Sequence, residues 1–191
     1  MSTSIPLTEK QHIEIMKAMN ETTVFYKRNP QVIAILITES STGLRLGDVL
    51  SIKLSLIRAS EKGYRLKIKE KKTGKERDVP IPAELYAYLT EYAISNGRKR
   101  DQTIFTLTPR AVTKYIKKVT DYLGLENVSS HSWRKMYALQ IYEKTGNDIV
   151  AVQQALLHSS LAVTQRYLNR RSEKLENVLQ NHCSIVNFEE E

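Results

Sequence analysis

The sequence has little of several residue types that characterise particular protein classes. Its one cysteine, Cys183, permits no intrachain disulfide and no cysteine-rich zinc site, which fits a reducing compartment. Seven glycines and five prolines among 191 residues are too few for a fibrous or low-complexity protein. The longest aliphatic run, Val32–Ile37, is far shorter than the ~20 residues that span a bilayer. The N-terminal residues MSTSIPLTEK lack the pattern of a signal peptide. We therefore expect a soluble, cytoplasmic protein without a membrane partner.

Positively charged residues are in excess. The chain has 29 Lys and Arg residues against 21 Asp and Glu residues, which gives a formal net charge of +8 at pH 7. A basic protein favours polyanionic partners, because binding to nucleic acid releases condensed counterions. Ribosomal, membrane-surface and heparin-binding proteins share this property, so charge alone favours nucleic acid without selecting it. The hydrophobic fraction of 41% is sufficient for one domain with a core.

Helix-start and helix-stop signals divide most of the chain. Thr8 and Gln11 form a capping-box pattern that opens a helix reaching about Asn20. Asn29 opens a second helix, which is apolar on nearly all sides, is therefore predicted to be central, and ends at Gly43. A short helical turn around Asp48 follows. Further helices are predicted from Pro82 to about Ser95, Thr108 to about Tyr122, Ser130 to Lys144, Asn147 to Leu157, Ser159 to Leu168, and from Ser172 onward.

Residues 51–80 have a different hydrophobic pattern from the predicted helices, because apolar and polar side chains alternate there. The alternation covers Ile52–Leu56 and Tyr64–Ile68, and a third segment ends in Val79–Pro82. Turn residues separate the three segments, which predicts three short antiparallel strands. The predicted fold class is therefore mainly α with a small three-stranded antiparallel sheet (α+β).

The same patterns predict one domain over residues 1–191. Within it, residues 172–191 are expected to form a helical tail. Three apolar residues, Leu175, Val178 and Leu179, form a stripe on that tail, so it needs a docking groove.

The first of four clusters of candidate phosphate ligands is Thr42–Asp48. Arg45 follows a helix-ending glycine and can therefore point inward, and its planar guanidinium matches a pair of phosphate oxygens. Asp48, three residues later, is expected to hold that guanidinium in place. The alternative is an ordinary surface arginine in a loop.

The second and third clusters supply further cations. Residues 71–77 (KKTGKER) place lysines in a hairpin turn, which suits delivery of a proton to a leaving oxygen; a solvated charged face is the alternative. In HSWR, His131 and Arg134 are three residues apart and share a helix face, so they converge on one point. The alternative is a capping histidine and a surface arginine beside a buried Trp133.

The fourth cluster combines residues 156–160 (LLHSS) with Tyr167, which follows His158 by nine positions. A lone tyrosine near a helix end is usually half-buried packing. The chain has ten tyrosines, so no local rule selects this one. His158, at a helix junction, is equally well explained as a structural histidine.

The order of these clusters resembles the tyrosine recombinase (phage integrase) family over residues 45–167. The matching pattern is TGLR, a lysine hairpin, HxxR, and LxHSS with a tyrosine nine residues after the histidine. The resemblance implies that family's catalytic-domain fold and a site-specific recombinase or integrase that acts on double-stranded DNA at the nucleoid, together with other recombinase protomers. It implies cleavage and rejoining through a covalent 3′-phosphotyrosine, for integration or excision of a phage or transposon. The implied catalytic residues are Arg45, Lys72, His131, Arg134, His158 and Tyr167.

The implied residue types suit strand cleavage without a metal or cofactor. Two arginines and a histidine stabilise the extra negative charge on the non-bridging oxygens of the transition state. A phenol of pKa ~10 ionises more easily than an aliphatic alcohol, and its phosphate ester retains the bond energy for rejoining without ATP. In the family the hairpin lysine protonates the departing 5′ oxygen, and the HxxR histidine is a candidate for proton transfer with the tyrosine.

The sequence departs from the family pattern at several points. Leu157 stands where glycine often precedes the second histidine, Asp48 replaces a commoner glutamate, and Lys71 and Lys75 leave the lysine assignment open. The N-terminal core-binding domain of many members is absent from this chain, which is either a fragment, as we expect, or relies on partner subunits to grip DNA. The family's C-terminal segment often docks on a neighbouring protomer; packing of residues 172–191 on their own domain is equally compatible with the sequence.

Two alternatives of other kinds remain from the sequence. A type IB topoisomerase uses related chemistry to relax supercoils, but the compact size and the spacing from the histidine to the tyrosine favour a recombinase. A helical DNA-binding protein without catalysis fits the charge and helix content equally well.

Overall fold

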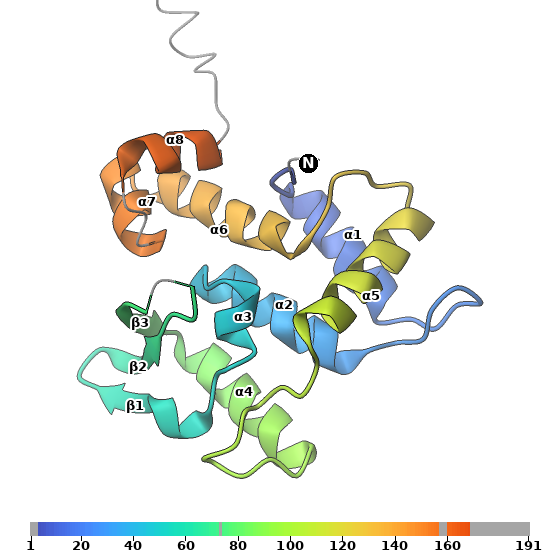
Figure 1. Ribbon diagram of the computed structural model, residues 1–191, viewed down its shortest axis with the longest axis horizontal. Helices are drawn as coiled ribbons and strands as arrows, with labels where there is room; N and C mark the ends of the chain where they lie inside the picture. The colour runs from blue at the N-terminus through green and yellow to red at the C-terminus, as the bar shows by residue number, and fades with distance from the viewer. Residues whose placement is uncertain (1–3, 73, 157–159, 169–191) are drawn as a thin grey trace, which may run out of the picture.

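The computed structural model describes residues 4–72, 74–156 and 160–168, and they form a mainly helical fold with one three-stranded sheet, as the sequence predicts (Figure 1). Helix α2 is central, because it contacts α1, α3, α4, α6 and β3. The elements are α1 (Glu9–Met19), α2 (Pro30–Thr42), α3 (Leu46–Val49), a 3₁₀ turn (Leu54–Leu56), β1 (Ile57–Ser60), β2 (Gly63–Lys69), β3 (Glu76–Ile81), α4 (Ala83–Ser95), α5 (Pro109–Tyr122), α6 (Ser130–Lys144), α7 (Ile149–Leu156) and α8 (Leu161–Leu168).

Side-chain caps begin α1, α2 and α5 where the sequence predicts. The hydroxyl oxygen of Thr8 accepts the backbone N–H of Gln11, and the Gln11 side chain accepts the N–H of Thr8. Asn29 and Thr108 each accept a backbone N–H in the first turn of α2 and α5. Each cap satisfies a donor that the helix start leaves unpaired, which stabilises the helix by ~1 kcal/mol.

The sheet differs from the prediction in its first strand. Its order is β1-β2-β3, antiparallel throughout, but β1 begins at Ile57, after the predicted segment Ile52–Leu56. The backbone of that segment pairs elsewhere: Ile52 accepts the N–H of Ile104 at 2.9 Å, and Ser55 donates to the carbonyl of Arg100 at 2.8 Å. Because these groups are already paired, the strand next to β2 starts later in the chain.

Two groups of buried apolar side chains hold the helices together. The larger one lies among α1, α2, α4, α5, the sheet and the first half of α6. The smaller one consists of Ala138, Val152, Leu156 and Leu168, from α6, α7 and α8. Figure 1 accordingly shows α7 and α8 gathered at one end of α6. The position of α8 is therefore set by packing against α6 and α7.

None of the helices within the described residues has the length and apolar character needed to cross a bilayer. The predicted tail, residues 172–191, lies outside the described residues.

Candidate active site

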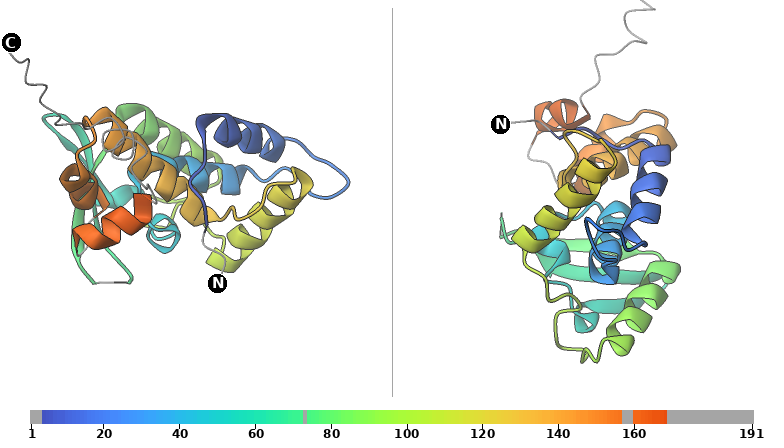
Figure 2. Two further views of the ribbon diagram at one scale, coloured as in Figure 1. Left: turned by 90° about the horizontal axis from the view of Figure 1, so that it is seen from above. Right: turned by 90° about the vertical axis from the view of Figure 1, so that its right-hand side faces the viewer.

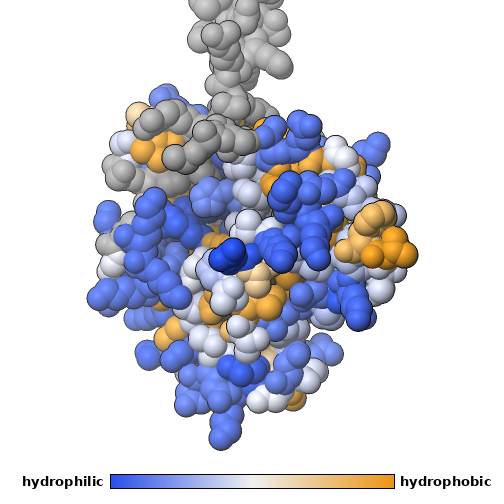
Figure 3. All heavy atoms as spheres, turned by 45° about the vertical axis from the view of Figure 1, so that its right-hand side comes forward, coloured by the Kyte–Doolittle hydropathy of each residue, from blue (hydrophilic) through white to orange (hydrophobic). Residues whose placement is uncertain are grey.

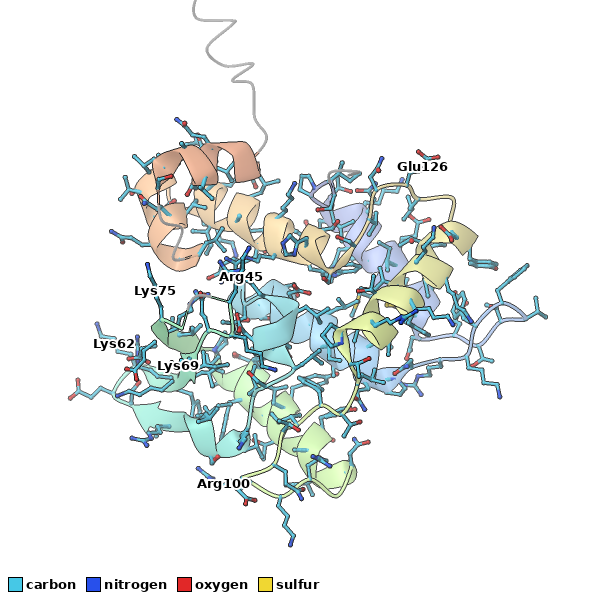
Figure 4. All side chains as sticks on the ribbon, viewed as in Figure 1. Arg45, Lys62, Lys69, Lys75, Arg100 and Glu126 are labelled. Carbon is cyan, nitrogen blue, oxygen red and sulfur yellow. The ribbon has the colours of Figure 1, made fainter. Side chains whose placement is uncertain are left out.

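Arg45 lies at the junction of α2 and α3, close to the end of β2. Gly43 ends α2 in the left-handed conformation (φ 62°), and Arg45 is the N-cap residue of α3. Its Nη1 donates to Oε2 of Glu70 at 2.7 Å, and 22% of the Arg45 side chain remains exposed. Figure 4 shows Arg45 between α3 and α6, beside the turn that joins β2 to β3.

The prediction that Asp48 holds Arg45 is wrong. Helix α3 turns Asp48 into the interior, where its Oδ1 accepts the backbone N–H of Lys71 at 2.9 Å. The carboxylate that pairs with Arg45 is Glu70, which lies 25 positions away in the sequence. Asp48 instead fixes the base of the turn between β2 and β3.

Arg134 is fully buried and joins three parts of the fold. From α6, its Nη1 donates to the carbonyl oxygen of Gly43, and its Nη2 donates to the carbonyl of Leu156 at 3.0 Å. These carbonyls belong to the ends of α2 and α7, where helices leave acceptors without partners in the helix itself. One guanidinium therefore connects the end of each helix to α6.

His131 lies one turn before Arg134 on α6 and is exposed. Partial loss of its water shell lowers the pKa of His131 below its ordinary value of 6.5, and the positive charges of Arg134, Lys135, Arg45 and Lys72 lower this pKa further. The imidazole is therefore neutral at pH 7. These four cations lie near one ring, although they come from three segments of the chain: α6, the start of α3, and the turn between β2 and β3.

Lys72 is exposed in the turn between β2 and β3. Lys71 and Lys75 are exposed in the same turn, and Figure 4 labels Lys75 there. Of these three lysines, Lys72 is the one whose charge affects the pKa of His131. The structure thus distinguishes Lys72 from its neighbours by its proximity to the imidazole.

The remaining two predicted residues belong to the last part of the described chain. Tyr167 is in the last turn of α8, and Leu168, next to it, is buried in the cluster shared with α6 and α7. The side chain of Tyr167 and the whole of His158 lie outside the described residues. The described geometry therefore brings together Arg45, Lys72, His131 and Arg134.

Sequence reasoning missed two buried charged residues in this region. Glu70 is 1% exposed and follows β2; Arg77, on β3, has a 4% exposed side chain and donates to Glu70 at 3.4 Å and to the carbonyl of Ala155 at 2.5 Å. A signal existed, because alternation places Arg77 on the same face of β3 as the buried Val79 and Ile81. Charged residues on a core-facing register are rare unless they are paired.

Tyr137 is a further residue of this region that the sequence did not indicate. It lies one turn after Arg134 on α6 and is half-buried. Burial raises the pKa of Tyr137, and the nearby guanidinium groups of Arg77 and Arg134 oppose that rise. Its ring packs directly on Gly43, so that a Cβ atom at position 43 would overlap the ring.

Gly43→Ala is expected to destabilise the protein by about 2–4 kcal/mol, because alanine is strained at this positive φ and overlaps Tyr137. Gly97→Ala is the matched control: Gly97 also has positive φ (63°), but a Cβ there meets no atom of the described residues within 4 Å. The control should cost about 1–2 kcal/mol, from the backbone alone. Urea unfolding of both variants measures the loss in the free energy of unfolding. Equal losses would show that the Tyr137 ring does not clash with a side chain at position 43.

Glu39 is a buried carboxyl group near Arg134. Within the described residues, neither of its carboxyl oxygens has a hydrogen-bond partner. Burial raises the pKa of Glu39 well above its ordinary value of 4.5, although the charge of Arg134 opposes this rise. The side chain is therefore neutral across a range of pH in which an exposed glutamate is ionised.

Glu39→Gln is expected to remove a pH dependence of stability. Because the folded-state pKa of Glu39 is raised, its contribution is fully present below pH 4.5 and is lost as the pH rises towards the folded-state pKa. In that window the wild type should lose about 1.4 kcal/mol per pH unit relative to the glutamine variant. Urea unfolding at several pH values measures the difference between the two proteins; a difference that does not change with pH would contradict the assignment.

Helix α5 lies on the same side of the molecule as the elements that carry Arg45 and Lys72. In the left view of Figure 2, α3, α5, α8 and the turn between β2 and β3 all lie along the lower edge, whereas α1 lies along the upper edge. Helix α5 buries Val112, Ile116 and Val119 and exposes basic side chains. The face shown in Figure 3 is largely hydrophilic, with separate hydrophobic patches.

Comparison with solved structures places the fold among known recombinase structures. The XerH site-specific recombinase bound to palindromic difH substrate superposes with a TM-score of 0.72 at 21% identity, over 92% of this chain and 52% of that one. The catalytic domain of bacteriophage HP1 integrase gives a TM-score of 0.66 at 20% identity, over 93% of this chain and 95% of that one. At these identities the likeness shows the fold.

Comparison of sequences identifies the family. The tyrosine recombinase XerA of Pyrococcus furiosus is 28% identical over 81% of this chain and 55% of its own length. The tyrosine recombinase XerC of Rickettsia bellii is 32% identical over 75% of this chain and 48% of its own length. The chain thus spans about half the length of these relatives. The model of the phage integrase family matches residues 6–174, and the chain belongs to that family.

Proposed function

We propose that this chain carries the catalytic site of a site-specific DNA recombinase. It cleaves and rejoins double-stranded DNA through a 3′-phosphotyrosine at Tyr167, for integration or excision of mobile DNA. The observation that carries this proposal is the contact between Arg134 and the carbonyl of Gly43, which brings the α6 helix turn of His131 and Arg134 to the segment that carries Arg45. In agreement with this geometry, burial lowers the pKa of His131, and the charges of Arg134, Arg45 and Lys72 lower it further. Guanidinium and ammonium groups around a neutral imidazole suit a phosphodiester.

Arg45 and Arg134 differ in solvent exposure, so they are proposed to reach the phosphate differently. Arg45, with its partly exposed side chain, donates to one non-bridging oxygen of the scissile phosphate. Arg134 is 1% exposed, so DNA binding must uncover at least one of its five N–H donors before a phosphate oxygen can reach it, while others hold the carbonyls of Gly43 and Leu156. Fixed donors of this kind are each worth about 10²–10³ in rate.

The reaction itself needs one nucleophile, one base and one acid. The phenol oxygen of Tyr167 attacks phosphorus, the bond from phosphorus to the 5′ oxygen breaks, and the 3′ phosphate stays on the tyrosine. Neutral His131 accepts the phenol proton, and Lys72 donates a proton to the departing 5′ oxygen. Attack by a 5′ hydroxyl reverses these steps and joins the strands. His158, two residues after the last residue of α7 in the sequence, is proposed to assist at the phosphate.

Helix α5 is proposed to lie along the DNA on the same face. Its exposed residues Arg110, Lys114 and Lys118 follow one another at intervals of four, so they form one basic stripe. The nearby Lys117 is ion-paired with Asp121 at 2.9 Å and contributes less charge. Such a stripe suits contact with the DNA backbone.

Lys114→Gln is expected to weaken DNA binding in a salt-dependent manner. Losing one phosphate contact should reduce the slope of log K against log salt by about 0.9. Lys117→Gln is the matched control, because the charge of Lys117 is already balanced by Asp121. Binding isotherms over a range of salt concentrations measure both slopes. Identical slopes for Lys114→Gln and the wild type would exclude this helix from the interface.

The names of relatives support the partners and location that we propose. A solved lambda integrase relative is a dimer bound to a core DNA site. By analogy, this chain is proposed to act with further protomers on DNA of the nucleoid. The relatives are recombinases, which favours recombination over the relaxation activity of a topoisomerase.

A covalent trap tests the proposed function. The chain is incubated with a library of nicked duplexes with a randomised core, from which a short cleaved fragment diffuses away so that rejoining fails. We expect a protein–DNA adduct that survives denaturant and, after digestion, a phosphotyrosyl peptide containing Tyr167. DNA binding without an adduct would instead support a DNA-binding protein that lacks catalysis.

A further inference from the structure

Glu70 is a buried carboxylate that holds two guanidinium groups of the candidate site. One oxygen accepts from Nη1 of Arg45 at 2.7 Å, and the other accepts from Nη1 of Arg77 at 3.4 Å. Glu70 is 1% exposed, so each ion pair lies largely out of water. Charge-assisted hydrogen bonds of this kind fix a side chain more firmly than contacts between exposed groups.

Glu70 and Arg45 differ in how far they are buried. The exposed fraction rises from 1% for Glu70 to 22% for the Arg45 side chain. Glu70 is therefore the buried member of the pair, whereas part of Arg45 is open to solvent. The exposed part of Arg45 is thus available to a phosphate while the bond to Glu70 is made.

Arg77 extends this network to α7. Its Nη2 donates to the carbonyl of Ala155, and Arg134 donates to the next carbonyl, that of Leu156. Two guanidinium groups thus bind neighbouring acceptors in the last turn of α7. Glu70 connects this last turn, through Arg77, to Arg45.

We propose that Glu70 is a positioning residue for DNA cleavage: it orients Arg45 towards the scissile phosphate and, through Arg77, ties Arg45 to the end of α7. This inference rests on the proposed function. Glu70 does not touch the substrate in this scheme. Glu70 acts on the reaction through Arg45. An effect of Glu70 that depends on the presence of Arg45 can therefore be distinguished from a purely structural effect.

A double-mutant cycle tests the dependence on Arg45. Single-turnover cleavage at saturating DNA is measured for the wild type, Glu70→Gln, Arg45→Ala and the double variant. We expect Glu70→Gln to lower the cleavage rate constant about 10–100-fold in the wild-type background, but less than about 3-fold when Arg45 is already alanine. The affinity for DNA should stay within about twofold, because only the orientation of one cation changes.

The control is a second ion pair on the same sheet. Asp78→Asn breaks the exposed pair between Arg65 and Asp78, which should leave the rate constant unchanged. Equal effects of Glu70→Gln in both backgrounds, or no effect in the wild type, would overturn the inference. Absence of any adduct with the wild type would instead overturn the proposed function.

A second variant covers the case in which Glu70→Gln is too unstable to purify. Glu70→Leu combined with Arg77→Met removes both buried charges together, which is far less destabilising than leaving one unpaired. The same cycle with Arg45→Ala is then run in this background. The inference requires the large loss of rate to disappear once Arg45 is absent, and a loss that persists contradicts it.

Discussion

Tyr167→Phe is expected to abolish covalent attachment of the chain to DNA while leaving DNA binding intact. The substitution removes one oxygen atom, which is the proposed nucleophile, and keeps the aromatic ring. Loss of the nucleophile from an enzyme that works through a covalent intermediate typically lowers the rate by at least ~10⁴. The measurement is the yield of denaturant-resistant adduct on a nicked duplex, together with the dissociation constant of the same duplex.

Tyr137→Phe is the control that the structure offers for this experiment. Tyr137 is a second phenol close to Arg77 and Arg134, and those guanidinium groups act on its pKa. If proximity to the cations alone defined the nucleophile, Tyr137 would be a candidate. We expect Tyr137→Phe to retain the adduct; loss of the adduct in this variant, with retention in Tyr167→Phe, would reverse the assignment.

Arg134→Lys is expected to lower the cleavage rate constant by about 10²–10³. Lysine keeps the positive charge, but a single ammonium cannot reproduce the planar fork that donates to Gly43 and Leu156 from two nitrogens. Arg134→Ala should in addition destabilise the fold by about 2–5 kcal/mol, because two buried carbonyls lose their donor. Urea unfolding separates the loss of stability from the loss of rate.

Arg65→Lys is the matched control for Arg134→Lys. Arg65 is paired with Asp78, and both side chains are more than one-third exposed, so this substitution should change neither the rate constant nor the stability measurably. A normal cleavage rate in folded Arg134→Lys would show that the guanidinium of Arg134 is structural. It would also leave Arg45 as the one arginine proposed at the phosphate.

The helices were predictable because their signals are local. A cap such as Thr8 or Asn29 acts on a backbone group three residues away, so the same stretch of sequence contains both partners. The left-handed end of α2 at Gly43 is likewise a property of one residue. The predicted first strand failed for the opposite reason: the backbone of Ile52 and Ser55 pairs with a segment that lies about fifty residues further along the chain.

In the candidate site, too, the sequence indicated the residues, whereas long-range contacts decided how they pair. The sequence indicated Arg45, Lys72, His131 and Arg134 by their order and spacing, and the fold brings them close enough for their charges to act on one imidazole. It also suggested Asp48 as the partner of Arg45, because these residues are close in the chain. Glu70 holds that position because β2 ends beside the start of α3.

The sequence by itself determined the helices of the described residues, the fold class and the residue types available to a phosphate, because periodicity, caps and motif spacing are properties of short segments. Only the tertiary structure decided which groups pair. The contact between Arg134 and Gly43 joins residues 91 positions apart, and the one between Arg77 and Ala155 spans 78. Such pairs form because burial leaves a guanidinium no water to bind, so it must find whichever acceptors the packed helices bring within reach.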